Sequence, residues 1–135
     1  MNPFGSPAAF QLAVDVEAPI ALDQATAGPV RLIRISGGTV TGSLNGKIVR
    51  GGTDWQSVTP DGTASIEARY LLELADGAIV ELQSRGKRTA DATHFWSSIW
   101  LRTAAPAHQA LNREQYLGYG VKRGGCVTID VFRLP

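Results

Sequence analysis

Hydrophobic and polar residues alternate over much of this chain, with the period of two that is typical of a half-buried β-strand. Between Phe10 and Val16, for example, every second side chain is a large apolar one. Short segments rich in glycine, proline or asparagine separate such stretches, as turns separate strands. The pattern predicts strands over residues 10–17, 30–36, 39–42, 47–49, 53–58, 65–74, 78–85, 93–103, 116–121 and 126–134.

The segments between these strands indicate how they connect. Asn45-Gly46 is a dipeptide typical of a hairpin turn, and Asp76-Gly77 predicts a second tight hairpin. Gly37-Gly38 is expected to end one strand, and residues 86–92 are expected to form a polar loop. Only residues 104–115 could hold a helical turn or two.

Consecutive hairpins with little helix predict an all-β fold, an antiparallel up-and-down β-barrel of about eight to ten strands. The 135 residues fit one domain, which we expect to span residues 1–135. An eight-stranded barrel can hold one small ligand inside. Which strand faces line that interior stays open, because a polar face is commonly solvated. Trp96 and Trp100 share the polar face of one strand, which favours a lined pocket there.

Composition and charge narrow the function classes. The chain is 44% hydrophobic and 19% charged, as in an ordinary globular protein, and its net charge of +1 gives no long-range attraction to nucleic acid or membranes. The first five residues lack the pattern of a signal peptide, and no stretch has transmembrane length. Cys126, the single cysteine, excludes an internal disulfide and is expected to be an inert core thiol. These features favour a cytoplasmic protein.

The segment Gly51 to Gln56 (GGTDWQ) is the strongest candidate for a site, because it places an acid beside a large aromatic after a glycine pair. Asp54 could act as a general acid or base, or it could only cap a turn. Arg69 could hold a ligand carboxylate, enolate or phenolate, or it could form a structural ion pair. Trp55 and Tyr70 could line a pocket or belong to the core.

The two histidines do not form a local metal motif. His94 could be an acid or base, and His108 is expected at the rim of the pocket. Asn112 could donate a hydrogen bond to a carbonyl or an oxyanion, or it could be a turn residue. Because phosphate loops and a serine nucleophile elbow are also absent from the sequence, we expect neither a metal nor a nucleotide cofactor.

Taken together, these motifs resemble the family called domain of unknown function 3237. The resemblance implies a single-domain, calycin-like antiparallel barrel without an established activity. The sequence departs from the family pattern at Ala110, where an aromatic residue is usual, and in a shortened segment after Arg102, which implies a more open rim near Asn112. The matching residues are Gly51 to Gln56, Asp61 to Ala64, Ala68 to Tyr70, Asp76-Gly77, Gly86, Arg102-Thr103, Leu111-Asn112, Gly118 and Gly120.

Three functions are compatible with this sequence. The first is a cofactor-independent isomerase, lyase or cyclase that transfers protons on a small cyclic or aromatic molecule. In it Asp54 is the acid or base, and Arg69 and Asn112 stabilise an oxyanion. The second is a carrier or sensor of a small hydrophobic ligand, which an outward-pointing Asp54 would favour. The third is a partner-binding module, and a homodimer is plausible in every case. The substrate-binding candidates are Trp55, Tyr70, His94, Trp96, Trp100 and Arg102.

Overall fold

The computed structural model describes residues 5–22 and 30–135. The expectation for the start of the chain therefore falls mostly on residues that it does not describe. The strands are β1 (Phe10–Val16), β2 (Ile20–Leu22), β3 (Val30–Gly42), β4 (Gly46–Ile48), β5 (Thr53–Val58), β6 (Ala64–Leu74), β7 (Ile79–Arg88), β8 (His94–Arg102), β9 (Tyr116–Arg123) and β10 (Cys126–Arg133), with a 3-10 helix η1 (Pro106–Asn112) between β8 and β9.

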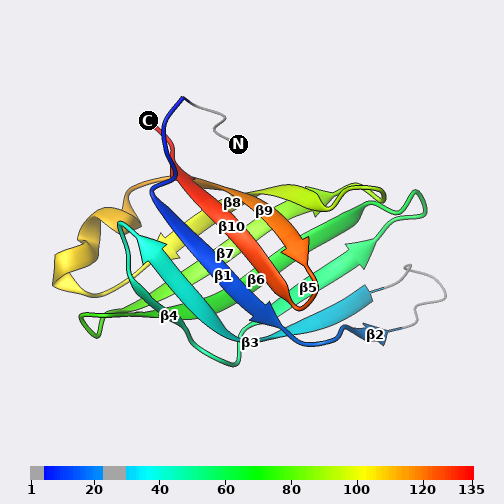
Figure 1. Cartoon of the computed structure of the whole chain (residues 1–135), viewed down its shortest axis with the longest axis horizontal. Coiled ribbons are helices and arrows are strands. Elements are labelled where there is room, and N and C mark those ends of the chain that lie inside the picture. The colour runs from blue at the N-terminus through cyan, green and yellow to red at the C-terminus, as the bar shows by residue number, and fades with distance from the viewer. Residues whose placement is uncertain (1–4, 23–29) are drawn as a thin grey trace.

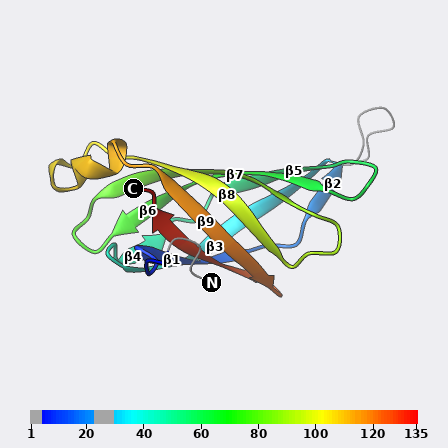
Figure 2. The ribbon, with the colours of Figure 1, turned by 90° about the horizontal axis from the view of Figure 1, so that it is seen from above.

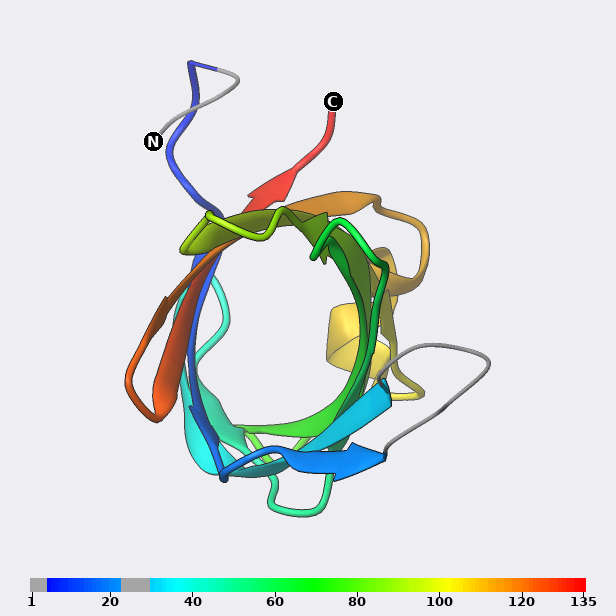
Figure 3. The same cartoon turned by 90° about the vertical axis from the view of Figure 1, so that its right-hand side faces the viewer.

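All ten strands belong to one antiparallel sheet that closes on itself as a barrel of eight strands with two extra ones (Figures 1 and 3). Neighbours from β6 to β10 follow each other along the chain, as in a meander. β1 completes the circle, because it pairs with β10 on one side and with β3 on the other. The predicted antiparallel β-barrel is thus confirmed. Among the described residues, none of the helices has the length and apolar character to cross a membrane.

Several strands run further than their local sequence predicts. Gly37-Gly38 does not end a strand, because both glycines pair with β1 and carry β3 on to Gly42. β7 continues to Arg88 through a segment expected to be a loop, since Gly86 pairs with both β6 and β8. β9 likewise extends to Arg123 because it stays paired with β10. Pairing with distant strands therefore decides where these strands end.

Side chains alternate between the barrel interior and its outer wall. The interior holds the core, whose most deeply buried members include Leu12, Leu72, Leu82 and Ile99. On β8 the inner face carries Phe95, Ser97, Ile99 and Leu101, so the aromatic stripe of this strand faces outward. Trp100 is 66% exposed, and the prediction that the two tryptophans of β8 line a pocket inside the barrel is wrong.

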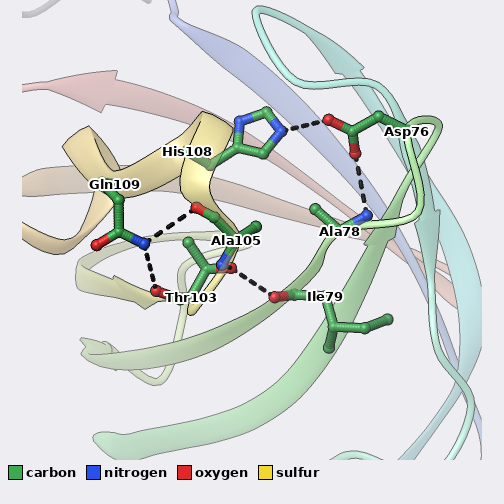
Figure 4. A network of polar contacts seen from close by, with 7 residues as sticks. All are labelled: Asp76, Ala78, Ile79, Thr103, Ala105, His108 and Gln109. Atoms are coloured by element: carbon green, nitrogen blue, oxygen red, sulfur yellow. Dashed lines mark hydrogen bonds and ion pairs between the residues drawn. The ribbon is translucent and has the colours of Figure 1, made fainter.

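The helix η1 lies at one end of the barrel, far from β2 and β5 (Figures 1 and 2). Leu111 is buried in the core, and the Asn112 side chain holds the backbone of Thr103, with Oδ1 accepting from its N–H at 2.8 Å and Nδ2 donating to its carbonyl at 2.9 Å. His108 Nε2 lies 2.6 Å from Asp76 Oδ2 in the β6–β7 turn (Figure 4). These contacts fix η1 to the barrel, and we call this end the closed end.

Candidate functional site

An interior cavity lies at the opposite end of the barrel, which we call the mouth and which faces the viewer in Figure 3. The cavity has a volume of ≈ 50 Å³, room for a few water-sized groups. Its wall is mostly apolar, as ligand sites usually are, with a few polar groups among the apolar ones. The lining residues are Val14, Val16, Ile33, Ile35, Asp54, Gln56, Ile66, Ala68, Tyr70, Ser84, Arg88, Phe95, Lys122, Val127 and Ile129.

Asp54 occupies an inner position of β5 and lines this cavity. Its Oδ2 accepts a hydrogen bond of 2.9 Å from Gln56 Nε2, while Gln56 Oε1 accepts one of 2.7 Å from Arg31 Nε. The amide of Gln56 is therefore fixed in one orientation between a cation and the acid. Asp54 Oδ1 is buried and has no hydrogen-bond partner among the described residues.

Burial raises the pKa of the Asp54 carboxyl above its usual range. The hydrogen bond from Gln56, the nearby backbone of Glu67, and the charges of Arg31 and Arg88 lower the pKa again, but they do not cancel the effect of burial. The backbone of Glu67 does not complete a hydrogen bond to Oδ1. A carboxylate held in this way is a stronger base than an exposed aspartate.

Tyr70, on β6, lines the same cavity and is only 3% exposed. Its hydroxyl is buried without a hydrogen-bond partner among the described residues. Burial, and to a lesser degree the charge of Asp54, raise the pKa of this hydroxyl well above its ordinary value. Tyr70 therefore stays protonated at neutral pH and can donate a hydrogen bond, while Asp54 can accept a proton.

The glycine pair of the GGTDWQ segment explains how Tyr70 is held. Gly51 has a φ of 116°, a left-handed conformation that favours glycine. A Cβ on Gly52 would collide with the Cβ of Tyr70 and lie 2.8 Å from the carbonyl oxygen of Arg69. The backbone ahead of β5 can therefore lie directly against β6, next to the cavity that Asp54 and Tyr70 share.

Two cations complete the lining of the cavity. Arg88 ends β7 and Lys122 lies near the end of β9, and both are half-buried. Neither forms an ion pair within the part of the chain that the structure describes. The cavity thus combines one carboxylate, one phenol and two unpaired cations with apolar walls.

Arg69, predicted to share a cavity with Asp54, lies on the outer wall instead. Its Nε donates to Glu81 Oε2 at 2.7 Å, and Arg102 Nε donates to Glu81 Oε1 at 2.8 Å. Although burial opposes it, the hydrogen bonds from the two arginines lower the pKa of Glu81. The expectation of a shared cavity was wrong because inner and outer positions alternate on β6, and Tyr70 holds the inner one.

The other predicted residues also lie outside the cavity. Trp55 is exposed on the outer face of β5, and His94 and Trp96 contact the ring of Tyr119 on the outer wall, with centroid distances of 5.8 and 4.6 Å. The structure places Asn112 and His108 at the closed end, as described above. Cys126 is half-buried at the start of β10, rather than a core thiol. Of the predicted site residues, only Asp54 and Tyr70 line this cavity, whereas Trp100, Arg102 and Asn112 line a separate hollow outside the barrel interior.

Sequence analysis missed five polar residues around this cavity: Arg31, Gln56, Ser84, Arg88 and Lys122. Gln56 stands two positions after Asp54, so the period of a strand was a usable signal that both share a face. By the same period of two, Arg31 lies on the same face of β3 as Ile33 and Ile35. Arg88 and Lys122 lay beyond the predicted strand ends, and no local signal marked them as inner residues. Among the described residues, no group of three or more His, Cys, Asp or Glu side chains is placed to hold a metal ion.

Comparisons with known proteins agree with this architecture. A UPF0311 protein of Clostridium acetobutylicum is 40% identical over 82 residues, which are 59% of this chain and 52% of the relative, so the match spans about half of that protein. The crystal structure of a β-barrel-like protein from Acinetobacter baumannii is 32% identical, with a TM-score of 0.88 over 96% of this chain and 94% of that one. An enzyme from Penicillium herquei shares the fold at 19% identity, with a TM-score of 0.69 over 97% of this chain and 99% of its own.

The family model described as "Protein of unknown function (DUF3237)" matches residues 6–134, which include every strand of the barrel and all the lining residues of the cavity. The resemblance inferred from the motifs is therefore confirmed, and the chain belongs to the DUF3237 family.

Proposed function

We propose that this protein is an enzyme that transfers a proton on a small organic molecule bound in the mouth of the barrel, as in an isomerase, lyase or cyclase reaction. The observation that carries the proposal is the pair of buried, unpartnered oxygens in one cavity, Asp54 Oδ1 and the Tyr70 hydroxyl. Leaving buried polar groups unpaired destabilises a protein, so a ligand that pairs with them is the simplest account of their retention.

The two groups suit opposite halves of a proton transfer. Asp54 Oδ1 accepts a proton from an acidic C–H or O–H of the ligand, and Gln56 holds the other carboxylate oxygen in place. The Tyr70 hydroxyl donates a hydrogen bond to the oxygen on which negative charge develops. Asp54 then returns the proton at another atom of the ligand. This assignment gives Tyr70 the oxyanion role that the sequence suggested for Arg69 and Asn112.

The barrel fold supports catalysis as well as binding, since the fold is shared with an enzyme from Penicillium herquei. Because that likeness extends only to the fold, the proposal depends on the cavity of this chain. The homodimer expected from the sequence stays a prediction.

Hydrogen–deuterium exchange tests the proposal without knowledge of the natural substrate. Small cyclic ketones and phenols would be incubated with the protein in D₂O, and exchange of their acidic C–H protons would be followed by NMR. We expect the Asp54→Asn variant to lose about 10²- to 10⁴-fold in exchange rate. Glu67→Gln, which removes an exposed carboxylate on the outer face of β6, is the matched control.

Undiminished exchange by the Asp54→Asn variant would refute the role of Asp54. Binding of these compounds in the cavity without any exchange would favour the carrier or sensor function instead.

A further inference from the structure

The mouth of the barrel carries more positive charge than the carboxylate of Asp54 can neutralise. The cavity is lined by Arg88 and Lys122, against the single carboxylate of Asp54. Arg31, a third cation nearby, is not among the lining residues; its 2.7 Å hydrogen bond to the neutral amide of Gln56 orients its side chain but leaves its positive charge in place. The lining of the cavity therefore has an excess of one positive charge.

Arg88 and Lys122 do not serve merely as counterions of Asp54. Neither forms an ion pair with it or with another carboxylate of the described residues. Their side chains come from different strands, yet both point toward one cavity whose depth holds the unpartnered hydroxyl of Tyr70. A half-buried cation without a partner has lost part of its hydration, which is unfavourable in free energy. An anion bound in the mouth would compensate for that loss.

We infer that the mouth selects small molecules with one carboxylate group, which Arg88 and Lys122 bind while the apolar body of the molecule enters the cavity. This inference rests on the proposed function for the site itself and names its substrate class.

A single negative charge balances the net charge of +1 on the lining residues, whereas a phosphate dianion would exceed the charge of the lining itself. The guanidinium of Arg88 offers the planar pair of donors that fits a carboxylate. With its carboxylate at the rim, a bound molecule has its far end directed toward Asp54 and Tyr70. The two cations would thus set the orientation in which the proton is transferred.

A matched set of probes tests this inference: benzoate, its uncharged isostere benzamide, and phenyl phosphate. Titrations followed by ¹⁵N–¹H correlation NMR give both the affinity and the location of each probe. We expect benzoate to bind about ten-fold more tightly than benzamide, the effect of one favourable charge interaction. Phenyl phosphate should bind less tightly than benzoate, and the shifted signals should belong to the mouth, such as Tyr70 and Val127.

The preference for benzoate should disappear in the double variant Arg88→Gln, Lys122→Met. The control is Lys87→Met with Arg123→Met, which removes two cations from the neighbouring outward positions of the same strands. Equal binding of benzoate and benzamide to the wild type would overturn the inference, as would a preference that survives the double variant or signal shifts confined to the outer wall. A stronger preference for phenyl phosphate would also overturn the choice of a carboxylate.

The Asp54→Asn variant separates this inference from the proposed function. Removal of the negative charge of Asp54 should strengthen benzoate binding while it abolishes proton exchange. If Asp54→Asn retains exchange but the carboxylate preference depends on Arg88 and Lys122, the proposed chemistry fails and the carboxylate site stands. If the preference is absent but exchange requires Asp54, the chemistry stands and the carboxylate site fails.

Discussion

The two ends of this barrel differ in how their polar side chains are hydrogen-bonded. At the closed end, polar side chains have partners: Thr103 Oγ1 donates to the carbonyl of Ile79 at 2.7 Å, and His108 pairs with Asp76 (Figure 4). Asn112 pairs with the backbone of Thr103. At the mouth, Asp54 and Tyr70 keep buried oxygens unpaired. Polar groups that bond to each other or to the backbone serve the fold. Among the described residues the Ser97 hydroxyl is buried and unpaired as well, but only Asp54 and Tyr70 share a cavity, so these two groups are the ones that indicate a ligand.

The largest difference between the close-packed core and the mouth is expected when core side chains are truncated. Leu72 is fully buried beyond the cavity, whereas Val127 lines the cavity and is half-buried. We expect Leu72→Ala to lower the free energy of unfolding by about 2–5 kcal/mol and Val127→Ala by about 1 kcal/mol, because only the former opens a new cavity in close-packed surroundings. Urea denaturation measures both. Equal losses would mean that the mouth is packed as tightly as the rest.

The contact between Gly52 and Tyr70 is the next target. Gly52→Ala should lower the free energy of unfolding by about 1–3 kcal/mol, because the added methyl group overlaps the Cβ of Tyr70 and forces the two strands apart. Gly125→Ala is the control, since its added Cβ would meet nothing nearer than the Val16 carbonyl oxygen at 3.6 Å. A Gly52→Ala protein as stable as the wild type would show that Tyr70 is not held by this close approach.

Replacement of Asp54 should stabilise the fold at neutral pH, in contrast to the two changes above. The folded-state pKa of Asp54 is raised by burial, so its ionised form is less favourable in the folded than in the unfolded protein. Asp54→Asn should therefore raise the free energy of unfolding by on the order of 1 kcal/mol at neutral pH. The gain should shrink as the pH falls below the raised pKa and vanish below the ordinary pKa of aspartate, where Asp54 is neutral in both the folded and the unfolded protein. Thermal unfolding across the acidic range measures this, and a destabilised variant at neutral pH would contradict it.

The smallest effect is expected at the closed end. The backbone N–H of Ala78 and the side chain of His108 lower the pKa of Asp76, so its ionised form contributes stability above the ordinary pKa of aspartate. That contribution is lost as the pH falls through the lowered pKa. Asp76→Asn should slightly lower the melting temperature at neutral pH and match the wild type in strong acid. A difference that persists in strong acid would rule out the charge of Asp76 as its cause.

The barrel could be predicted from the sequence because its strands are marked locally. Alternating residues and Asp-Gly or Asn-Gly turns are visible without knowledge of any partner strand, and β5 has the predicted bounds. The ends of β7 and β9 could not be predicted, because the segments near Gly86 and Gly124 have loop-like composition. They are extended only because they pair with neighbouring strands. Arg88 and Lys122 were therefore missed.

The site could be predicted only in part for a related reason. Periodicity separates the two faces of a strand but does not say which of them is inside. On β6 the choice between Arg69 and Tyr70 is a choice between faces, and a shift of one residue reverses it. Asp54 and Tyr70 were correctly singled out as candidates because acids and tyrosines are chemically distinctive, whereas Gln56 was not given a role because its function depends on two neighbours.

The double pairing of β1 also bears on how the protein is made. Of the described strands, β1 is synthesised first, but its second partner, β10, is synthesised last, with Phe10 opposite Val131. Until β10 leaves the ribosome, one edge of β1 presents unpaired backbone groups to its surroundings, and such edges invite pairing between different chains. The pairing that closes the finished barrel therefore leaves this edge of β1 open to aggregation until β10 has been made.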